Sequence, residues 1–350
     1  MRPSRSRSAV AAAVVLAGVL AGIAAPASAG WWRARRHYAP AGPLVPGWHD
    51  DLTVESGGLL RYYRVYVPQG LAPGAPLVIL LHGGSQSMRK IFGPNAGGTN
   101  AWPGLADASG FLLVAPNGVN ASTGSTSGDN QNWNDCRGDM TAGNSGADDV
   151  GFIGALIDQL RGTYATDPAR VYVTGASNGG MMTFRVAIEL GDRIAGAAAF
   201  IAGMPAVNQC RAPLRPVPML IVDGTADPYV PWAGGPVAGS DSGHGAVVSA
   251  ADTLAYWQAA DHAATAAAST VALADRDPAD GSTVSLAIYP ALAGGAPVEF
   301  ATVTGGGHTM PSVAFPVPSV FRVLLGLGGQ NQDVEGAELA WSFLRQQRLP

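Results

Sequence analysis

The stretch RVYVTGASNGGMM, residues 170–182, decides the fold. Its first part, Val171–Thr174, is an apolar run typical of a buried strand, and residues 178–190 form a pattern that predicts a helix. Between the two, GASNG at residues 175–179 fits the pattern G-x-S-x-G. A sharp strand-to-helix turn needs small residues beside the serine, and it holds the hydroxyl above a helix N-terminus that favours developing negative charge. Ser177 is therefore predicted to be a catalytic nucleophile.

Strands and helices alternate on both sides of this turn. Strands are expected at residues 61–67, 77–81, 111–115, 171–174, 197–201, 218–222 and 298–303. Helices are expected at residues 150–160, 178–190, 249–261 and 334–344, and residues 118–146 form one long polar loop. The alternation predicts an α/β fold with a mostly parallel central sheet flanked by helices. No internal repeat or change in composition divides residues 51–350, so we expect one catalytic domain there.

The first 29 residues have the pattern of a signal peptide. Arg2, Arg5 and Arg7 precede an apolar run from Ala9 to Ala25, and Ala27-Ser28-Ala29 forms a small-x-small cleavage site. The alternative is a transmembrane anchor, but the run of about 17 residues is at the lower limit of what spans a bilayer. We therefore expect a secreted, extracellular protein without a stable membrane anchor, in which residues 30–50 form an irregular leader.

Composition narrows the classes of partner and cofactor. Hydrophobic residues make up 47% of the chain, which is enough for a large core, whereas charged residues make up only 13%, against about 25% in an ordinary globular domain. The net charge of −4 and the lack of basic runs argue against a nucleic-acid partner. Cys136 and Cys210 are the only cysteines, so they form one intrachain disulfide or remain two buried thiols. No Cys/His cluster is present, so neither a metal nor another cofactor is expected.

A serine nucleophile needs a base and an acid, which follow it in this architecture in the order acid, histidine. Of the six histidines, three precede Ser177, one lies in a Gly/Ser loop and one ends a helix. His308 lies in GGGHT, just after the strand expected at residues 298–303, and is the predicted base. Asp227 is the preferred acid because a loop carboxylate can reach the histidine, and Asp223, nearer the strand end, is the competing candidate.

An oxyanion hole is expected where His82-Gly83-Gly84 follows the strand at residues 77–81. We assign its donors to the backbone N–H groups of Gly84 and Asn178, with Ser85 as the next possibility. His82 itself is interpreted as a packing and hydrogen-bonding residue beneath this loop.

A larger set of motifs points to a known family. LVILLHGG, GFLLVAPNG, NWN with Cys136, DDVGFIGALIDQL, RVYVTGASNGGMM, PMLIVDGTADPYVPW and GGGHT occur here in the family's order. Over residues 52–346 the chain resembles the secreted polyhydroxybutyrate depolymerase/feruloyl esterase family of α/β-hydrolases. The resemblance implies a carboxylic-ester hydrolase with a Ser177–Asp227–His308 triad and a Cys136–Cys210 disulfide. Trp133 and Trp232 resemble positions near the family's substrate cleft, where they stack on an acyl group or simply fill core.

Three departures from the family pattern concern the site. Asp223 stands where the family usually has His, and Met310 follows the His-Thr pair where Trp is common. Residues 311–332 form a longer and more apolar segment than expected, either a surface insertion packed on the core or a lid or acyl-chain surface.

The leading hypothesis is a secreted serine esterase that acts on hydroxyalkanoate (polyhydroxybutyrate-type) esters or oligomers through an acyl-enzyme. The alternatives are a feruloyl or acetylxylan esterase on plant polysaccharide, a peptidase or acyltransferase with the same triad, and a non-catalytic wall-binding protein. No polymer-binding module follows residue 346, which favours soluble esters or oligomers. The oligomeric state stays open.

Overall fold

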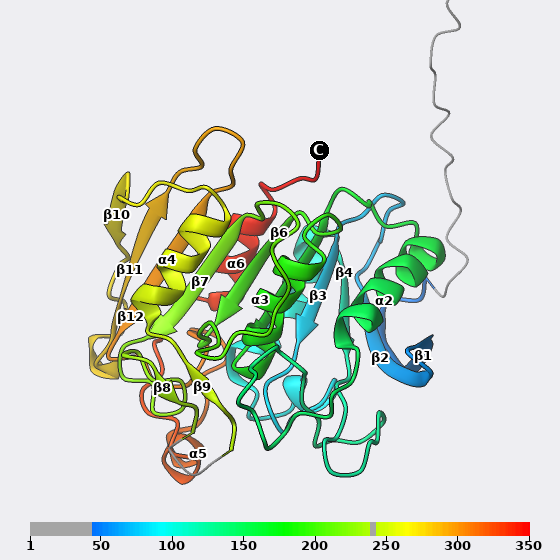
Figure 1. Ribbon diagram of the computed structural model, residues 1–350, viewed down its shortest axis with the longest axis horizontal. Coiled ribbons are helices and arrows are strands. Elements are labelled where there is room, and N and C mark those ends of the chain that lie inside the picture. Colours follow the sequence, from blue (N-terminus) through cyan, green and yellow to red (C-terminus); the bar gives the residue numbers. More distant parts are fainter. Residues whose placement is uncertain (1–43, 239–242) are drawn as a thin grey trace, which may run out of the picture. The chain divides into compact units, whose positions relative to one another are not determined.

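A sheet of ten strands, parallel in its middle, is the framework of the residues that the computed structural model describes, 44–238 and 243–350 (Figure 1). The expected signal peptide and most of the expected leader lie outside these residues. In spatial order the strands are β1 (Gly47–Ser56), β2 (Leu59–Val67), β4 (Leu112–Pro116), β3 (Leu77–Leu81), β5 (Val171–Ala176), β6 (Gly196–Phe200), β7 (Met219–Gly224), β12 (Val298–Thr304), β11 (Thr283–Tyr289) and β10 (Ser269–Ala272).

The six strands from β4 to β12 in that order run parallel, and the outer strands on both sides pair antiparallel. Strands β3, β4 and β6 are buried along their whole length, which explains their continuous apolar sequences. After β3, the chain forms β4 on one side of β3 and then crosses back to form β5 on the other side of β3. Such a reversal opens a crevice at the carboxyl ends of the strands, where ligands bind in open α/β sheets.

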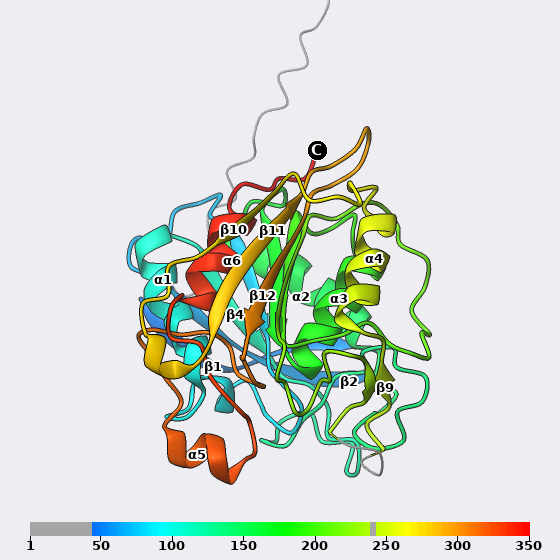
Figure 2. The ribbon, with the colours of Figure 1, turned by 90° about the vertical axis from the view of Figure 1, so that its left-hand side faces the viewer.

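Helices cover both faces of the sheet (Figures 1 and 2). One face carries α2 (Asp149–Tyr164), α3 (Asn178–Glu189) and α4 (Ala250–Ala260), and its core contains Phe152 and Trp257. The other carries α1 (Trp102–Ser109) and α6 (Gly336–Leu344), with Trp102 and Trp341 in its core. The chain also forms 3-10 turns η1 (Lys90–Phe92), η2 (Gly97–Ala101) and η3 (Pro278–Asp280), helix α5 (Ser319–Leu324), and the two-stranded β8 (Gly235–Pro236) and β9 (Ala246–Val247).

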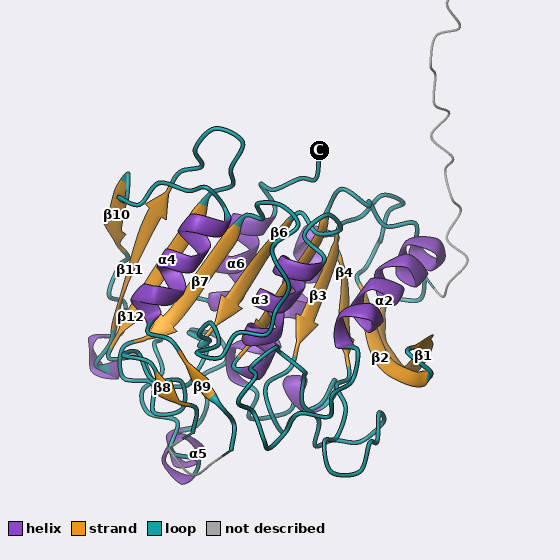
Figure 3. Ribbon diagram, in the orientation of Figure 1, coloured by secondary structure: helices purple, strands orange, loops and turns teal. Residues whose placement is uncertain are grey.

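Long loops and α5 lie beyond the carboxyl ends of the parallel strands (Figure 3). The described part of the chain contains no helix with both the length and the apolar character needed to cross a bilayer.

The predicted fold class is confirmed, but the edges of the sheet differ from expectation. Strand β1 begins at Gly47, inside the segment expected to be irregular, and strands β10 and β11 were not predicted. All four residues of β10 are exposed, so this strand has no buried face to produce an apolar pattern. Helix α1 was also missed, because Pro103 and Gly104 near its start weaken its helical pattern.

Candidate active site

Ser177 occupies the sharp turn between β5 and α3. Its backbone has φ 57° and ψ −126°, a conformation that side chains rarely adopt. Two glycines make this turn possible. A Cβ on Gly179 would lie 2.3 Å from the backbone oxygen of Leu81, and one on Gly175 would lie 2.5 Å from the oxygen of Gly179. The G-x-S-x-G pattern therefore reflects close backbone packing around Ser177, which is half-buried and lines a cavity.

The structure brings Ser177, His308 and Asp227 together at the carboxyl edge of the sheet. His308 Nε2 lies 2.9 Å from Ser177 Oγ, and His308 Nδ1 lies 2.8 Å from Asp227 Oδ2. The other carboxylate oxygen of Asp227 accepts hydrogen bonds from the backbone N–H groups of Tyr229 at 2.7 Å and Val230 at 2.8 Å. The loop after β7 thus fixes Asp227, which in turn sets the orientation of the imidazole.

Asp223, the competing acid, has a different environment. It lies within β7, is buried, and accepts a hydrogen bond from the backbone N–H of Ala202 at 2.9 Å. Burial, reinforced by the nearby Asp227 carboxylate, raises the pKa of Asp223 to about 8. The histidine pairs with Asp227, as the loop argument expected.

The two backbone N–H groups expected to form an oxyanion hole belong to residues that line one cavity with Ser177. Within the described residues, the N–H groups of Gly84 and Asn178 donate to no protein acceptor, and the latter lies at the start of α3. The N–H of Ser85, by contrast, donates to Asn132 Oδ1 at 3.1 Å. This arrangement leaves Gly84 and Asn178 able to bind a substrate oxygen.

Residues 132–137, which we call the Asn-Trp-Asn strap, hold this part of the site in place. Asn178 Oδ1 accepts the backbone N–H of Trp133 at 2.8 Å, and its Nδ2 donates to the Trp133 oxygen at 3.1 Å and to Asp135 Oδ2 at 2.6 Å. The indole N–H of Trp133 donates to the backbone oxygen of His82 at 2.9 Å. The strap therefore connects Asn178, the residue after Ser177, to the loop after β3.

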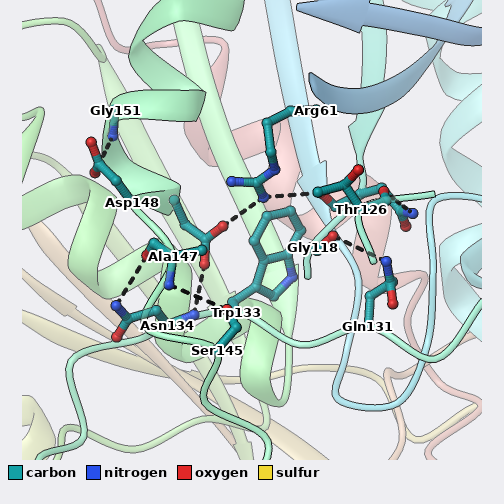
Figure 4. A network of polar contacts seen from close by, with 12 residues as sticks. Arg61, Gly118, Thr126, Gln131, Trp133, Asn134, Ser145, Ala147, Asp148 and Gly151 are labelled. Carbon is teal, nitrogen blue, oxygen red and sulfur yellow. Dashed lines mark hydrogen bonds and ion pairs between the residues drawn. The ribbon is translucent and has the colours of Figure 1, made fainter. Parts of the chain in front are cut away.

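A buried ion pair anchors the strap from behind. Arg61 Nη2 lies 2.6 Å from Asp149 Oδ1, and the other oxygen of Asp149 accepts the backbone N–H of Asn134 at 2.8 Å. Figure 4 shows Arg61 above Trp133, with Asn134 also bonded to Ala147. Asp149 thus joins the strap to Arg61 in β2, and removal of either charged partner would leave the other buried and unpaired.

The imidazole of His82 is a neutral structural group beneath the loop. Its Nδ1–H donates to the Gly83 oxygen at 2.8 Å, while Nε2 accepts the backbone N–H of Gly118 at 3.0 Å. Complete burial lowers the pKa of His82 to about 4. One ring nitrogen donating and the other accepting is the arrangement of a neutral histidine, as the packing interpretation expected.

Cys136 and Cys210 form a disulfide at the end of the strap. Beside it, Gly138 N–H donates to the Val207 oxygen at 2.7 Å and Gln209 N–H to the Cys136 oxygen at 3.0 Å. The disulfide closes a loop with a sequence separation of 74 residues. The chain-entropy model gives such a crosslink about 4 kcal/mol of stability.

A cavity of about 620 Å³ opens over the serine. Much of its wall is aliphatic or sulfur-containing, and these residues are Ile91, Met140, Met181, Ile201, Val237, Met310, Val317, Leu325 and Leu327. Met310, one of the departures from the family pattern, thus forms part of this wall, as do residues of the segment 311–332.

The two tryptophans proposed to contact substrate do not line this cavity. Trp133 is fully buried, with its indole N–H used internally. Trp232 packs edge-to-face on Phe300, with ring centroids 5.9 Å apart. The core-filling alternative therefore describes Trp133, whereas Trp232 is half-buried at the edge of the core, and neither ring lines the cavity over Ser177.

The residues of the site that sequence reasoning missed include Tyr229, His244 and Asn132. Tyr229 and His244 line the cavity, and Asn132 binds the N–H of Ser85. The ring of Tyr229 stacks on that of His308, with centroids 5.0 Å apart. The NWN motif was a signal for Asn132 and the motif PMLIVDGTADPYVPW contains Tyr229, but nothing in the local sequence marks His244.

Known proteins resemble the chain in sequence and in fold. No family model matches it. It is 32% identical over 300 residues to the "Putative esterase NocK" of Nocardia uniformis subsp. tsuyamanensis, covering 82% of this chain and 80% of that protein. It is 34% identical over 148 residues to poly(3-hydroxyalkanoate) depolymerase C of Paucimonas lemoignei and 28% identical over 179 residues to feruloyl esterase C of Emericella nidulans.

These last two matches cover 42% and 50% of this chain, and 32% and 58% of the relatives' own length. Among solved structures, acetyl xylan esterase from Aspergillus awamori superposes with a TM-score of 0.52 at 16% identity, covering 79% of this chain and 99% of that one. The structural likeness concerns the fold.

Proposed function

The chain belongs to the α/β-hydrolase family of carboxylic-ester hydrolases that includes polyhydroxyalkanoate depolymerases and feruloyl esterases, and from this premise we propose that it is an extracellular serine esterase for hydroxyalkanoate esters or oligomers. One observation carries the proposal: a single imidazole, His308, lies within hydrogen-bond distance of both the Ser177 hydroxyl and the Asp227 carboxylate. That is the arrangement a serine needs to become a nucleophile.

In the proposed mechanism, Ser177 Oγ attacks the ester carbonyl carbon while His308 Nε2 takes the hydroxyl proton. Asp227 keeps the imidazole proton on Nδ1 and stabilises the imidazolium that forms. The negative charge on the carbonyl oxygen is bound by the N–H groups of Gly84 and Asn178, a kind of contribution typically worth about 3 kcal/mol per donor. His308 then protonates the leaving alcohol, and a water molecule activated by His308 hydrolyses the acyl-serine ester.

The cavity wall favours an aliphatic acyl group over an aromatic one. Among the described residues that line it, Tyr229 is the only Phe, Tyr or Trp, and its ring already stacks on His308. Beyond this ring, a feruloyl group would find no other Phe, Tyr or Trp ring to stack on in the described wall. The many aliphatic and methionine side chains suit the short methyl-bearing units of a hydroxyalkanoate chain.

Extracellular action is supported by two features. The N-terminal sequence carries the charged, apolar and small-residue segments of a signal peptide, and Cys136 is joined to Cys210. Disulfides persist in oxidising compartments outside the cytosol. Expression of the full chain in a secreting bacterium should release a protein whose first residue is Gly30, and retention of the uncleaved chain in the cytosol would contradict this proposal.

A panel of matched soluble esters tests the activity. Purified wild type and Ser177→Ala should be compared for release of 3-hydroxybutyrate, acetate and ferulate, with a matched anilide as a test of amide cleavage. We expect the wild type to cleave the 3-hydroxybutyrate ester best and the variant to cleave none. Preferential release of ferulate would replace the substrate proposal, and equal activity of the variant would overturn the nucleophile assignment.

A further inference from the structure

An exposed group of large apolar side chains lies on the segment 311–332. Six of the fourteen exposed large hydrophobic residues in the described chain belong to this segment: Val313, Phe315, Val320, Val323, Leu324 and Leu325. We call these six residues the apolar apex. Val320, Val323 and Leu324 have the i, i+3, i+4 spacing that places side chains on one face of a helix, and they are 67%, 82% and 76% exposed. Contiguous exposed apolar surface of this kind marks an interaction site.

The apex is built on a fixed base. His308 N–H donates to the Leu327 oxygen at 2.6 Å and Gly307 N–H donates to the Gly329 oxygen at 2.8 Å, so the second half of the segment binds the histidine loop. Ser312 N–H donates to the Asn331 oxygen at 2.9 Å, which joins the two ends of the segment to each other. Gln330 closes the base further, since it accepts the N–H of Val317 at 2.6 Å and donates to the Met310 oxygen at 2.9 Å. The segment is therefore hydrogen-bonded to the same loop that presents the catalytic base.

Charge is nearly absent from this segment. Arg322 is its one charged residue. The guanidinium group is turned back onto the segment's own backbone, where Nε donates to the Val317 oxygen at 3.2 Å and Nη1 to the Gly328 oxygen at 3.3 Å. The outward face thus offers hydrocarbon, without a cationic rim for phosphate headgroups.

The apex is continuous with the active-site cavity. Leu325 is half exposed as part of the apex and also lines the cavity over Ser177, together with Val317 and Leu327 from the same segment. Figures 1 and 2 both show α5 beyond the carboxyl ends of the parallel strands, the edge that carries the nucleophile turn. A second copy of the chain seated there would cover the entrance to the cavity, whereas a substrate held there would be presented to it.

We propose that the apolar apex docks the enzyme on the surface of an insoluble aliphatic polyester, from which single chains enter the cavity. This inference rests on the proposed function, because it identifies the physical form of the substrate that the same site hydrolyses. Apolar surface buried against the polymer supplies the binding energy. The segment therefore acts as an interfacial binding element, although no separate polymer-binding module was expected from the sequence.

Adsorption measured without hydrolysis tests the docking surface. The apex double variant Val323→Ser/Leu324→Ser, made in the Ser177→Ala background, should be depleted from solution by poly(3-hydroxybutyrate) particles about tenfold less strongly than Ser177→Ala alone. The matched control is Leu214→Ser/Leu292→Ser, which removes side chains that are 59% and 56% exposed outside the segment. It should adsorb like the parent. With Ser177 intact, the apex variant should hydrolyse soluble p-nitrophenyl acetate within about twofold of wild type, since neither Val323 nor Leu324 lines the cavity.

Each other outcome has a distinct meaning. Equal adsorption of the apex variant and its parent would overturn the docking proposal, as would equally strong binding of the parent to phosphatidylcholine vesicles. A wild-type dimer that the apex substitutions dissociate would assign the surface to a second copy instead. Absence of soluble ester hydrolysis by the wild type would overturn the proposed function, and the adsorption result in the Ser177→Ala background does not depend on that activity.

Discussion

The ring of Tyr229 stacks on the imidazole of His308, with the centroids 5.0 Å apart and the planes inclined by 24°. The Tyr229 hydroxyl donates to the Leu325 oxygen at 2.7 Å, so one side chain contacts both the base and the segment that carries the apex. We infer that Tyr229 positions the imidazole, with its ring against one face while Asp227 binds Nδ1.

Two substitutions separate the roles of its ring and hydroxyl. Tyr229→Ala removes the stack and should lower kcat on a soluble ester about 10- to 100-fold, because a misplaced base transfers the proton poorly. Tyr229→Phe keeps the ring and should retain kcat within about threefold. Steady-state kinetics of both variants provide the measurement. A Tyr229→Ala enzyme with normal kcat would show that Asp227 alone orients His308.

A substitution at Trp133 tests whether this side chain has a structural role or binds substrate. Trp133→Phe leaves the buried backbone oxygen of His82 without its indole donor, which should cost about 1–3 kcal/mol in the free energy of unfolding. KM for soluble esters should stay unchanged because the ring does not line the cavity. Urea denaturation and steady-state kinetics measure the two quantities. An increase in KM with no loss of stability would restore the interpretation of Trp133 as a substrate-binding residue.

Replacement by alanine is expected to have opposite effects on stability at Gly179, in the turn after Ser177, and at Gly104, in helix α1. Gly179→Ala would place a Cβ 2.3 Å from the Leu81 oxygen and 2.5 Å from the His82 oxygen, so it should destabilise the fold by more than about 3 kcal/mol. Gly104 in α1 has nothing within 4 Å of its Cβ position, and Gly104→Ala should stabilise by about 0.5–1 kcal/mol. Melting temperatures of both variants make the comparison. A stable, active Gly179→Ala enzyme would contradict the close backbone packing described for this turn.

Asp223 predicts a pH dependence of stability. Its pKa rises on folding from about 3.8 to about 8, so the folded state holds a proton that the unfolded state releases. Stability from this group is full below about pH 4 and is lost as the pH rises toward 8. Asp223→Asn keeps an oxygen for the Ala202 N–H but cannot ionise. It should match wild type at pH 4 and exceed its unfolding free energy by a few kcal/mol at pH 9.

Urea denaturation of both proteins across this pH range measures the difference. Asp261, whose pKa is also raised to about 8 by burial, is present in both proteins and cancels in the comparison. A constant difference between variant and wild type at all pH values would show that folding does not raise the pKa of Asp223.

The buried parts of the fold were predictable because burial leaves a pattern. Residues 77–81 and 218–222 gave continuous apolar runs, and the structure has β3 and β7 at those places. Ser177, Asp227 and His308 could be chosen because each follows an expected strand and because serine, acid and histidine occur in that order along the chain.

Contacts between loops could not be predicted in the same way. The hydrogen bonds that join Asn132 and Trp133 to residues 82–85 connect irregular segments, whose side chains follow no period. The local sequence around a tryptophan does not reveal whether its ring lies in the core or in a cleft. The burial of Trp133 in the structure answers that question for this residue. Likewise, the apolar residues of 311–332 revealed their hydrophobicity in the sequence, but their exposure required the structure.

The central claim is that Ser177 forms the acyl-enzyme. Incubation with a fluorophosphonate, followed by mass spectrometry of proteolytic peptides, measures this directly. We predict stoichiometric phosphonylation of the peptide containing Ser177, with complete loss of ester hydrolysis. The Asp227→Asn and His308→Asn variants should be labelled much more slowly than the wild type. A label on another residue, or full esterase activity in a protein labelled at Ser177, would contradict the account.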